Sequence, residues 1–230
     1  MATVLPLSSR EEAGRLLADL LAPLCPEDNL LILALPRGGV PVGFEIAQAL
    51  RAEFDVLLVR KLGAPSNPEL ALGAIAAGGI QVMNSDVAAW ADVAPEVLSA
   101  LMQSETLELQ SRLELYRRHR PWPPIAGRTV VLVDDGIATG ATMRAAIAAV
   151  RTQEPSRVVV AAPVAPPDTV ATLMPLADAT VCLATPEPFG AIARFYREFP
   201  QVPDAEVISL LARAWQLPHG VARGSGLLNR

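Results

Sequence analysis

The chain has 230 residues and a net charge of −5, and 51% of its residues are hydrophobic; this suits one domain with a sizeable core and argues against non-specific nucleic-acid binding. No apolar run reaches the roughly 18–20 residues that cross a membrane, and residues 1–10 lack the pattern of a signal peptide. The two cysteines, Cys25 and Cys182, lie among apolar neighbours, so we expect reduced core thiols in a cytoplasmic protein.

The chain begins with patterns for a helix, a strand and a second helix. Ser8 and Ser9 each precede a glutamate by three residues, and the leucines that follow recur at helical spacing. These features predict a helix over 10–22 that packs on a sheet. The apolar run 30–35 is typical of a core strand, and a helix is expected over 41–52.

The turn between that strand and the second helix contains Arg37, Gly38 and Gly39. An arginine offers a forked cation and glycines leave backbone N–H groups open, so this turn can hold an anion. The plain alternative is a loop that only joins a strand to a helix.

Two further cations follow the apolar run 54–59, which predicts the next strand. Arg60 and Lys61 would lie at its C-terminal end, where open α/β sheets bind their ligands. Lys61 is the only lysine among 19 basic residues, which makes it a candidate for a specific task; chance is the alternative. The segment 62–70, rich in Gly, Pro, Ser and Asn, is interpreted as a lid loop that carries Glu69; a plain surface loop is the alternative.

The middle of the chain predicts a hairpin and a long helix. Two short apolar runs flank Gly78-Gly79, which is typical of a β-hairpin. Apolar residues at helical spacing predict a helix over about 86–119, broken near Pro95. Residues 112–120 are basic; a solvent-exposed face is the usual interpretation, and contact with an anionic ligand in a neighbouring subunit is the alternative.

The strongest motif lies in residues 130–142. Four apolar residues suit a strand buried on both faces of a parallel sheet, and Asp134 and Asp135 follow it directly. The start of the helix expected over 143–153 favours an anion, while the carboxylates suit vicinal hydroxyls, so the motif predicts a site for a sugar phosphate. The residues that would hold the phosphate are Ala138, Thr139, Gly140, Ala141 and Thr142. A buried strand with an Asp-rich turn is the alternative.

The C-terminal third predicts core strands over 157–163 and 179–184, with a short helix between them, and a final helix over 205–217. Four of the ten aromatic residues fall within eleven positions that begin at Phe189. A ring there could stack on a flat base, although core packing is the commoner explanation for at least two of the four. The tail, 219–230, is polar and glycine-rich and is expected to be disordered.

The strand, paired aspartates and Thr-Gly loop resemble the motif with which type I phosphoribosyltransferases (PRTases) bind 5-phosphoribosyl-1-pyrophosphate (PRPP). The resemblance covers residues 30–190, and the turn at Arg37-Gly38-Gly39 is similar to the pyrophosphate loop of the xanthine/guanine enzymes. It implies a type I PRTase fold: an α/β domain with a mainly parallel twisted sheet flanked by helices. Residues 1–218 would form one domain, with a helical insertion at 84–124 and a small hood at 185–200.

The resemblance also implies a reaction. Type I enzymes bind PRPP with Mg²⁺, and a nitrogen nucleophile, such as a nucleobase or related heterocycle, displaces pyrophosphate. In this chain Asp134 and Asp135 would hold the ribose hydroxyls and contact Mg²⁺ indirectly, mainly through PRPP. Residues 138–142 would hold the 5′-phosphate. We also expect a homodimer.

Further implied contacts concern the leaving group and the acceptor. The Arg37-Gly38-Gly39 turn would bind pyrophosphate, with help from Arg60 or Lys61. The acceptor would lie beside Ile137 and Phe189. The family often has a non-proline cis peptide in the pyrophosphate turn, so one is expected between residues 36 and 37.

One position departs from the hypoxanthine/guanine-type enzymes, which carry an aspartate just before the Thr-Gly of the loop. Here that position is Ala138, so the carboxylate that handles the purine N7 proton is absent, and Glu69 is a candidate substitute base. Residues 60–70 are similar to those of a group of bacterial predicted phosphoribosyltransferases. Two alternatives stay open: a PRPP-sensing regulator that binds nucleic acid, against which the net charge counts, and a non-catalytic PRPP-binding subunit.

Overall fold

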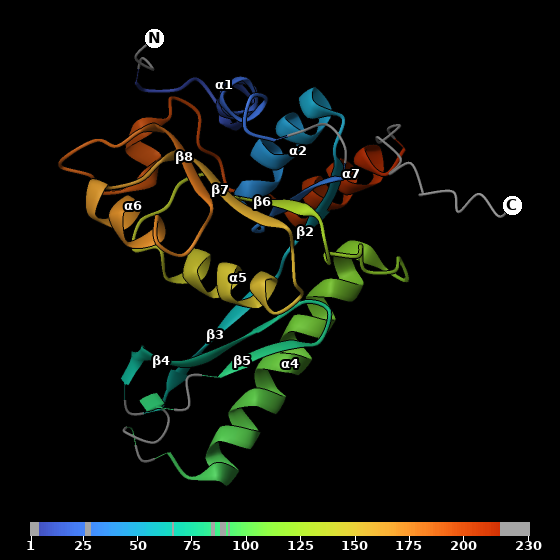
Figure 1. Cartoon of the computed structure of the whole chain (residues 1–230), viewed down its shortest axis with the longest axis vertical. Coiled ribbons are helices and arrows are strands. Elements are labelled where there is room, and N and C mark those ends of the chain that lie inside the picture. The colour runs from blue at the N-terminus through green and yellow to red at the C-terminus, as the bar shows by residue number, and fades with distance from the viewer. Residues whose placement is uncertain are drawn as a thin grey trace, which may run out of the picture.

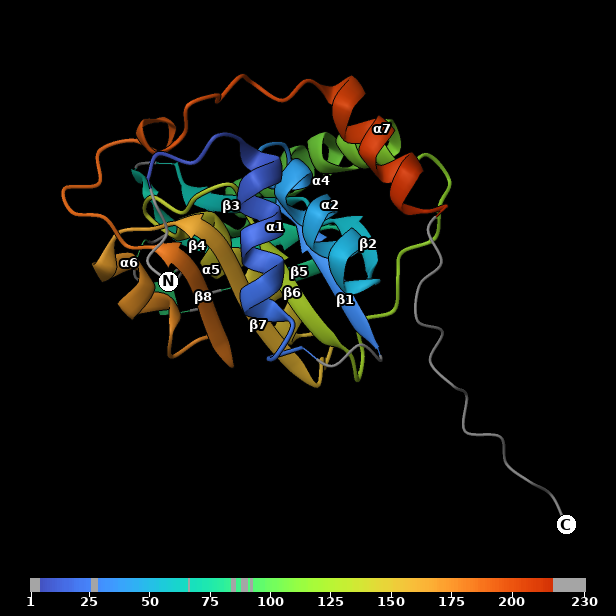
Figure 2. The same ribbon diagram turned by 90° about the horizontal axis from the view of Figure 1, so that it is seen from above.

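The computed structural model describes residues 5–25, 29–65, 67–83, 86–87, 91 and 93–216. Its main body is a five-stranded parallel sheet in the order β2-β1-β6-β7-β8, with helices on both faces (Figures 1 and 2). The strands are β1 (Leu30–Ala34), β2 (Glu53–Val56), β6 (Thr129–Val133), β7 (Arg157–Val164) and β8 (Ala179–Ala184). This architecture confirms the expected α/β fold with a mainly parallel sheet.

Two helical layers enclose the sheet, and every residue of β1 and β6 is buried between them. One face is covered by α1 (Arg10–Leu21), α2 (Gly39–Leu50) and α7 (Asp204–Ala214). The other face is covered by α5 (Ala141–Arg151) and α6 (Pro167–Leu173). Strand side chains alternate between the layers: Ile32 and Val131 pack toward α1 and α2, whereas Leu33 and Leu132 pack toward α5.

Helix starts differ from the predicted ones by up to two residues. As expected, α1 is capped by Ser9, whose side-chain oxygen accepts a hydrogen bond from the Glu12 N–H at 3.4 Å. By contrast α2 begins at Gly39 and α5 at Ala141, two residues earlier than predicted in each case. The first turns of both helices therefore include residues of the two predicted anion-binding turns.

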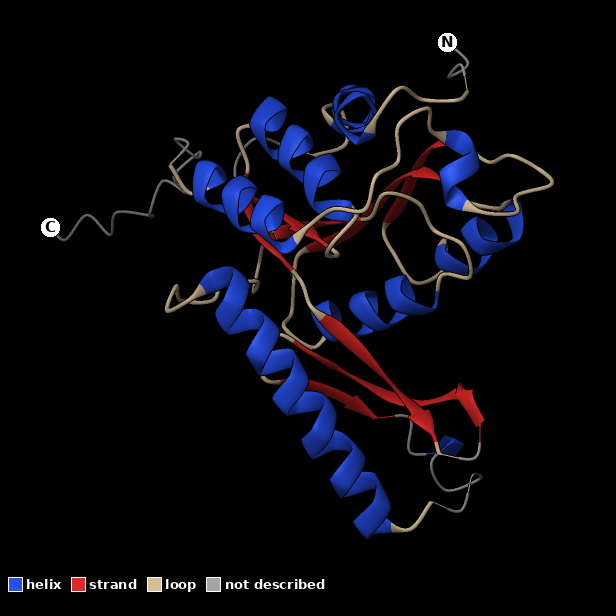
Figure 3. Ribbon diagram, turned by 180° about the vertical axis from the view of Figure 1, so that it is seen from behind, coloured by secondary structure: helices blue, strands red, loops and turns tan. Residues whose placement is uncertain are grey.

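A smaller module projects from the main body and consists of an antiparallel sheet beside a long helix (Figure 3). Its elements are β3 (Val59–Ala64), β4 (Asn67–Ala76), β5 (Ile80–Met83) and α4 (Pro95–Arg117). The hairpin at Gly78-Gly79 is confirmed, and α4 begins at Pro95, where the break in the predicted helix was expected. The exposed-face interpretation of residues 112–120 is wrong at Arg117, which is buried and donates to both carboxylate oxygens of Asp55 on β2 at 2.8 Å.

Two predictions for residues 54–70 are wrong. The apolar run does not form one strand: β2 ends at Val56, so Arg60 and Lys61 lie inside β3 of the small sheet instead of at the end of a parallel strand. The segment 62–70 is not an irregular loop, because β3 and β4 pair across it as an antiparallel ribbon. The residues that indicated a loop are accommodated by an irregular register on both sides of Gly63.

The segment expected to form a hood, residues 185–200, contains the 3₁₀ helix η1 (Ile192–Phe195) and lies against the N-terminal segment. The Leu7 N–H donates to the Phe195 carbonyl at 2.8 Å, and Leu7 forms a β-bridge with Tyr196. The tail expected to be disordered, 219–230, lies outside the described residues. No helix in the described part of the chain combines the length and hydrophobicity needed to cross a bilayer.

Candidate functional site

The turns that follow β1 and β6 lie side by side, because these strands are neighbours and end at the same level of the sheet. The approach is close. A Cβ added to Gly38 would collide with the Asp135 carboxylate, and one added to Gly39 would lie 2.6 Å from the Val133 carbonyl oxygen. Both glycines are therefore required by the contact between the two turns.

The turn after β6 leads into the N-terminus of α5. Gly140 has a φ of 73°, a left-handed conformation that suits glycine, and provides no side-chain cap for the helix. The Ala141 N–H donates only at long distance, 3.4 Å, to Thr139 Oγ1. The helix begins with N–H groups that face the turn, and its first turn has no acidic residue, so it favours an anion.

The carbonyl groups of this turn are engaged by other elements. Thr169 Oγ1 on α6 donates to the Ala138 carbonyl at 2.7 Å, and Arg144 Nη1 donates to the Thr139 carbonyl at 3.0 Å. These bonds hold the acceptors of the turn away from an incoming anion. The predicted phosphate-binding residues 138–142 thus form one compact turn whose remaining groups are mainly donors.

The two aspartates have different surroundings. Asp135 Oδ2 accepts from Arg10 Nε and lies 2.8 Å from Arg10 Nη2, and both side chains are buried. The Arg10 guanidinium also lies 3.8 Å from the centre of the Phe199 ring, and the Tyr196 hydroxyl donates to the Asp135 carbonyl at 2.6 Å. Asp135 is therefore held by an ion pair within the protein.

Asp134 forms no salt bridge with the residues that the structure describes; its Oδ1 accepts from the Asp135 N–H at 2.8 Å. Burial and the charge of Asp135 raise the pKa of the Asp134 carboxyl well above its ordinary value. Because Arg10 favours the ionised form of Asp135, a second charge on Asp134 is disfavoured. Hydroxyl donors or a cation at Asp134 would relieve this cost.

The turn after β1 lies beside the end of α4 and the start of α7. The expected cis peptide between Pro36 and Arg37 is confirmed. Arg37 Nη1 lies 3.8 Å from Asp204 Oδ1, which also accepts from the Tyr116 hydroxyl at 2.5 Å. Burial and Asp204 raise the pKa of Tyr116 to about 12, so the hydroxyl stays a donor. One prediction is wrong: the Gly39 N–H is not open to an anion, because it donates to the carbonyl of residue 35 at 3.1 Å.

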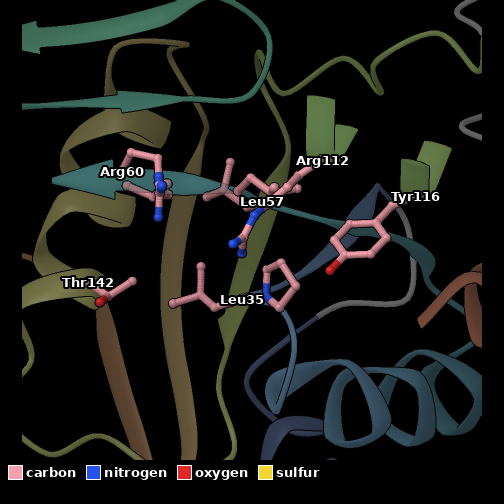
Figure 4. Close-up of a pocket in the computed structure, with 9 residues that line it drawn as sticks. Leu35, Leu57, Arg60, Arg112, Tyr116 and Thr142 are labelled. Atoms are coloured by element: carbon pink, nitrogen blue, oxygen red, sulfur yellow. The ribbon is translucent and has the colours of Figure 1, made fainter. Parts of the chain in front are cut away.

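A cavity of about 130 Å³ lies between these turns and the smaller module (Figure 4). Pro36 lines it from the turn after β1 and Thr142 from the first turn of α5. Arg60 lines it from β3, and Arg112 and Tyr116 line it from α4. In Figure 4 the guanidinium groups of Arg60 and Arg112 extend toward the same space. The cavity therefore borders both predicted anion-binding turns and has two arginines in its wall.

The other predicted site residues lie elsewhere or are not described. Lys61 does not line this cavity, since neighbouring residues of a strand face opposite ways and Arg60 is the one that does. The side chain of Glu69 lies outside the described residues. Ile137 is buried in the core beside α5, whereas Phe189 is half-buried and packs against Phe195, with ring centres 5.0 Å apart.

Three residues near the site were not predicted from the sequence: Arg10, Tyr116 and Asp204. One signal was available for Arg10, because a cation at the first position of a helix opposes the helix dipole and needs a compensating partner. Tyr116 and Asp204 are ordinary members of amphipathic helices. Only the packing of α4 against α7 brings them to the Arg37 turn.

The chain was compared with known proteins. The sequence profile of the phosphoribosyl transferase domain matches residues 8–197. Two proteins of Mycobacterium tuberculosis, from strains H37Rv and CDC 1551, are each 48% identical to the chain over 205 residues; their names assign them provisionally as phosphoribosyl transferases. The match covers 89% of this chain and 46% of each relative, so the chain spans about half the length of these proteins.

Two solved structures resemble the chain. TT1426 from Thermus thermophilus is 45% identical, with a TM-score of 0.83, over 90% of this chain and 98% of that one. A hypothetical protein from Neisseria gonorrhoeae with bound ppGpp has a TM-score of 0.50 at 13% identity, over 93% of this chain and 98% of that one. The second likeness concerns the fold alone.

Proposed function

Because the chain belongs to the phosphoribosyl transferase domain family, we propose that it transfers the phosphoribosyl group of Mg-PRPP to a nitrogen nucleophile and releases pyrophosphate. The acceptor would be a nucleobase or a related heterocycle. One observation carries the proposal: the donor-rich turn at residues 138–142 lies beside the turn of Arg37. Asp134 lies between the end of β6 and the donor-rich turn. A sugar with phosphates at both ends matches this order of groups.

In this assignment the 5′-phosphate lies on residues 138–142 and the ribose hydroxyls donate to Asp134. The Asp135 carboxylate, already paired with Arg10, would support the turn. It would act on the ribose indirectly, through its effect on the charge of Asp134. Arg37 and Arg60 would neutralise the leaving pyrophosphate. Mg²⁺ prefers oxygen ligands and keeps several from its substrate, so PRPP oxygens with help from Asp134 form a suitable set. The ion would neutralise charge on the departing pyrophosphate.

Replacement of Asp134 with Asn tests the donor site. The variant keeps the side-chain shape and an acceptor for the Asp135 N–H, but it removes the charge that favours the ribose hydroxyls and Mg²⁺. We expect Mg-PRPP affinity to fall about tenfold or more, the loss of charge-assisted hydrogen bonds. Calorimetric titration measures the affinity. Arg15→Gln, at an exposed position on α1, is the control and should bind as the wild type does. Equal affinity in wild type and variant would sink the assignment.

A non-catalytic PRPP-binding or PRPP-sensing protein is the second candidate. At Ala138 the chain lacks the carboxylate that handles the acceptor proton in hypoxanthine/guanine-type enzymes, which speaks against a 6-oxopurine acceptor and leaves the general base unassigned. Release of pyrophosphate in the presence of purines, pyrimidines and small amines distinguishes an enzyme from a binder. Binding of Mg-PRPP with no turnover across that screen would favour the second candidate.

A further inference from the structure

Arg112 of α4 lies in the wall of the cavity that borders both predicted anion-binding turns. The same cavity is lined by Pro36, next to Arg37, and by Thr142, at the start of α5 (Figure 4). Arg60 reaches it from β3. Two guanidinium groups from the smaller module therefore approach a space bounded by the main body, and nothing in the assignment above gives Arg112 a task.

Two carboxylates of α4 neutralise these arginines. Arg60 Nε lies 2.9 Å from Glu105 Oε2, and its Nη2 contacts the Glu108 carboxylate. Arg112 Nη2 lies 3.3 Å from Glu108 Oε1. Glu108 thus bridges both arginines, and its side chain and that of Arg112 are each about half exposed, at 46% and 53%. Ion pairs this exposed are weak and exchange readily for another anion.

The position of Arg112 relative to the turn of Arg37 is fixed by its neighbours on α4. Tyr116 lies one helical turn further along the same face of α4, and its hydroxyl bonds to Asp204 beside Arg37. Arg117, the next residue, is fixed to β2 by its buried pair with Asp55. The end of α4 is therefore fastened to the main body at two points, which places Arg112 at a defined position over the cavity.

We propose that Arg112, together with Arg60, binds the diphosphate group of the ligand, and that Glu108 is an internal competitor that this group displaces. The inference rests on the proposed function. Displacement leaves each guanidinium with an anionic partner, while the Glu108 carboxylate moves into water at little cost because it is already half exposed. The leaving group would then be bound by Arg37 on one side and by the smaller module on the other.

The test compares Arg112→Gln and Glu108→Gln by calorimetric titration with Mg-PRPP, magnesium pyrophosphate and ribose 5-phosphate. Arg112→Gln should weaken Mg-PRPP and pyrophosphate about tenfold, the effect of one charge-assisted contact. Glu108→Gln should strengthen both several-fold, because the competitor loses its charge. Neither variant should alter ribose 5-phosphate, which has no diphosphate. Arg15→Gln and Glu114→Gln, exposed positions outside the cavity, are the matched controls.

The outcomes separate this inference from the proposed function. Failure of the wild type to bind Mg-PRPP would contradict the proposed function and the inference with it. If the wild type binds but both variants bind with unchanged affinity, the inference alone is overturned. A loss of affinity in Glu108→Gln would show that Glu108 orients the arginines, which contradicts competition. If Arg112→Gln does not fold, the titration of Glu108→Gln with magnesium pyrophosphate still tests whether Glu108 competes with the diphosphate group.

Discussion

Asp134 and Asp135 are adjacent in one turn, but their surroundings differ. Asp135 is paired with the buried Arg10, whereas Asp134 has no cation of its own among the described residues. A carboxyl whose pKa is raised in the folded state costs stability when it is ionised. The protein therefore carries at Asp134 a charge that the proposed ligand, and not the fold, would stabilise.

Asp134→Asn should make the unliganded protein more stable at neutral pH, although it weakens Mg-PRPP binding. The folded-state pKa of Asp134 lies above the unfolded value of about 3.9, so wild-type stability falls as the pH rises through the window between them. The advantage of the variant should shrink as the pH falls toward about 4. Urea unfolding at several pH values measures it; a variant that is less stable at pH 7 would contradict the assignment.

The end of α4 and the start of α7 meet beside the turn of Arg37. The Tyr116–Asp204 hydrogen bond joins the end of α4 to the start of α7, and Asp204 faces Arg37. Arg37 itself lies in the turn after β1. The two helices therefore supply side chains that position a cation on a separate segment of the chain.

Tyr116→Phe keeps the ring and removes the hydroxyl that orients Asp204. We expect the KM for Mg-PRPP to rise roughly threefold to tenfold, the net effect of one ordinary hydrogen bond, because the hydroxyl acts on Arg37 only through Asp204; kcat should change little. Asp204→Asn should act through the same contact, so the double variant should lose less than the sum of the two. Additive effects in that cycle would show that the two side chains act separately.

At the scale of the whole molecule, Arg10 joins three segments that are distant in sequence. It pairs with Asp135 after β6, donates to the Pro200 carbonyl at 2.8 Å and stacks on Phe199. The N-terminal helix, the central turn and the segment before α7 are thereby held together. A buried ion pair of this kind is costly to break on one side, because the remaining charge stays buried.

Arg10→Gln should lower the free energy of unfolding by about 3–5 kcal/mol, the usual cost of leaving one partner of a buried pair uncompensated. For a chain of this length the midpoint of thermal unfolding should fall by roughly 10 °C. Arg15→Gln on the same helix removes an exposed pair with Glu45 and should have little effect. Similar unfolding midpoints for the two variants would contradict a structural role for Arg10.

Local sequence patterns are sufficient to predict the parallel sheet, most helices and the loop at residues 138–142, because apolar runs, capping residues and glycines act over a few neighbouring positions. Three features became evident from the folded chain: Arg60 lies on an antiparallel ribbon, Arg10 pairs with Asp135, and Arg112 lines the cavity. The Arg10–Asp135 pair joins positions 125 residues apart, and no local pattern encodes it, since a buried charge finds its partner only when distant segments pack together. Arg112 reaches the cavity because α4 packs beside the main body.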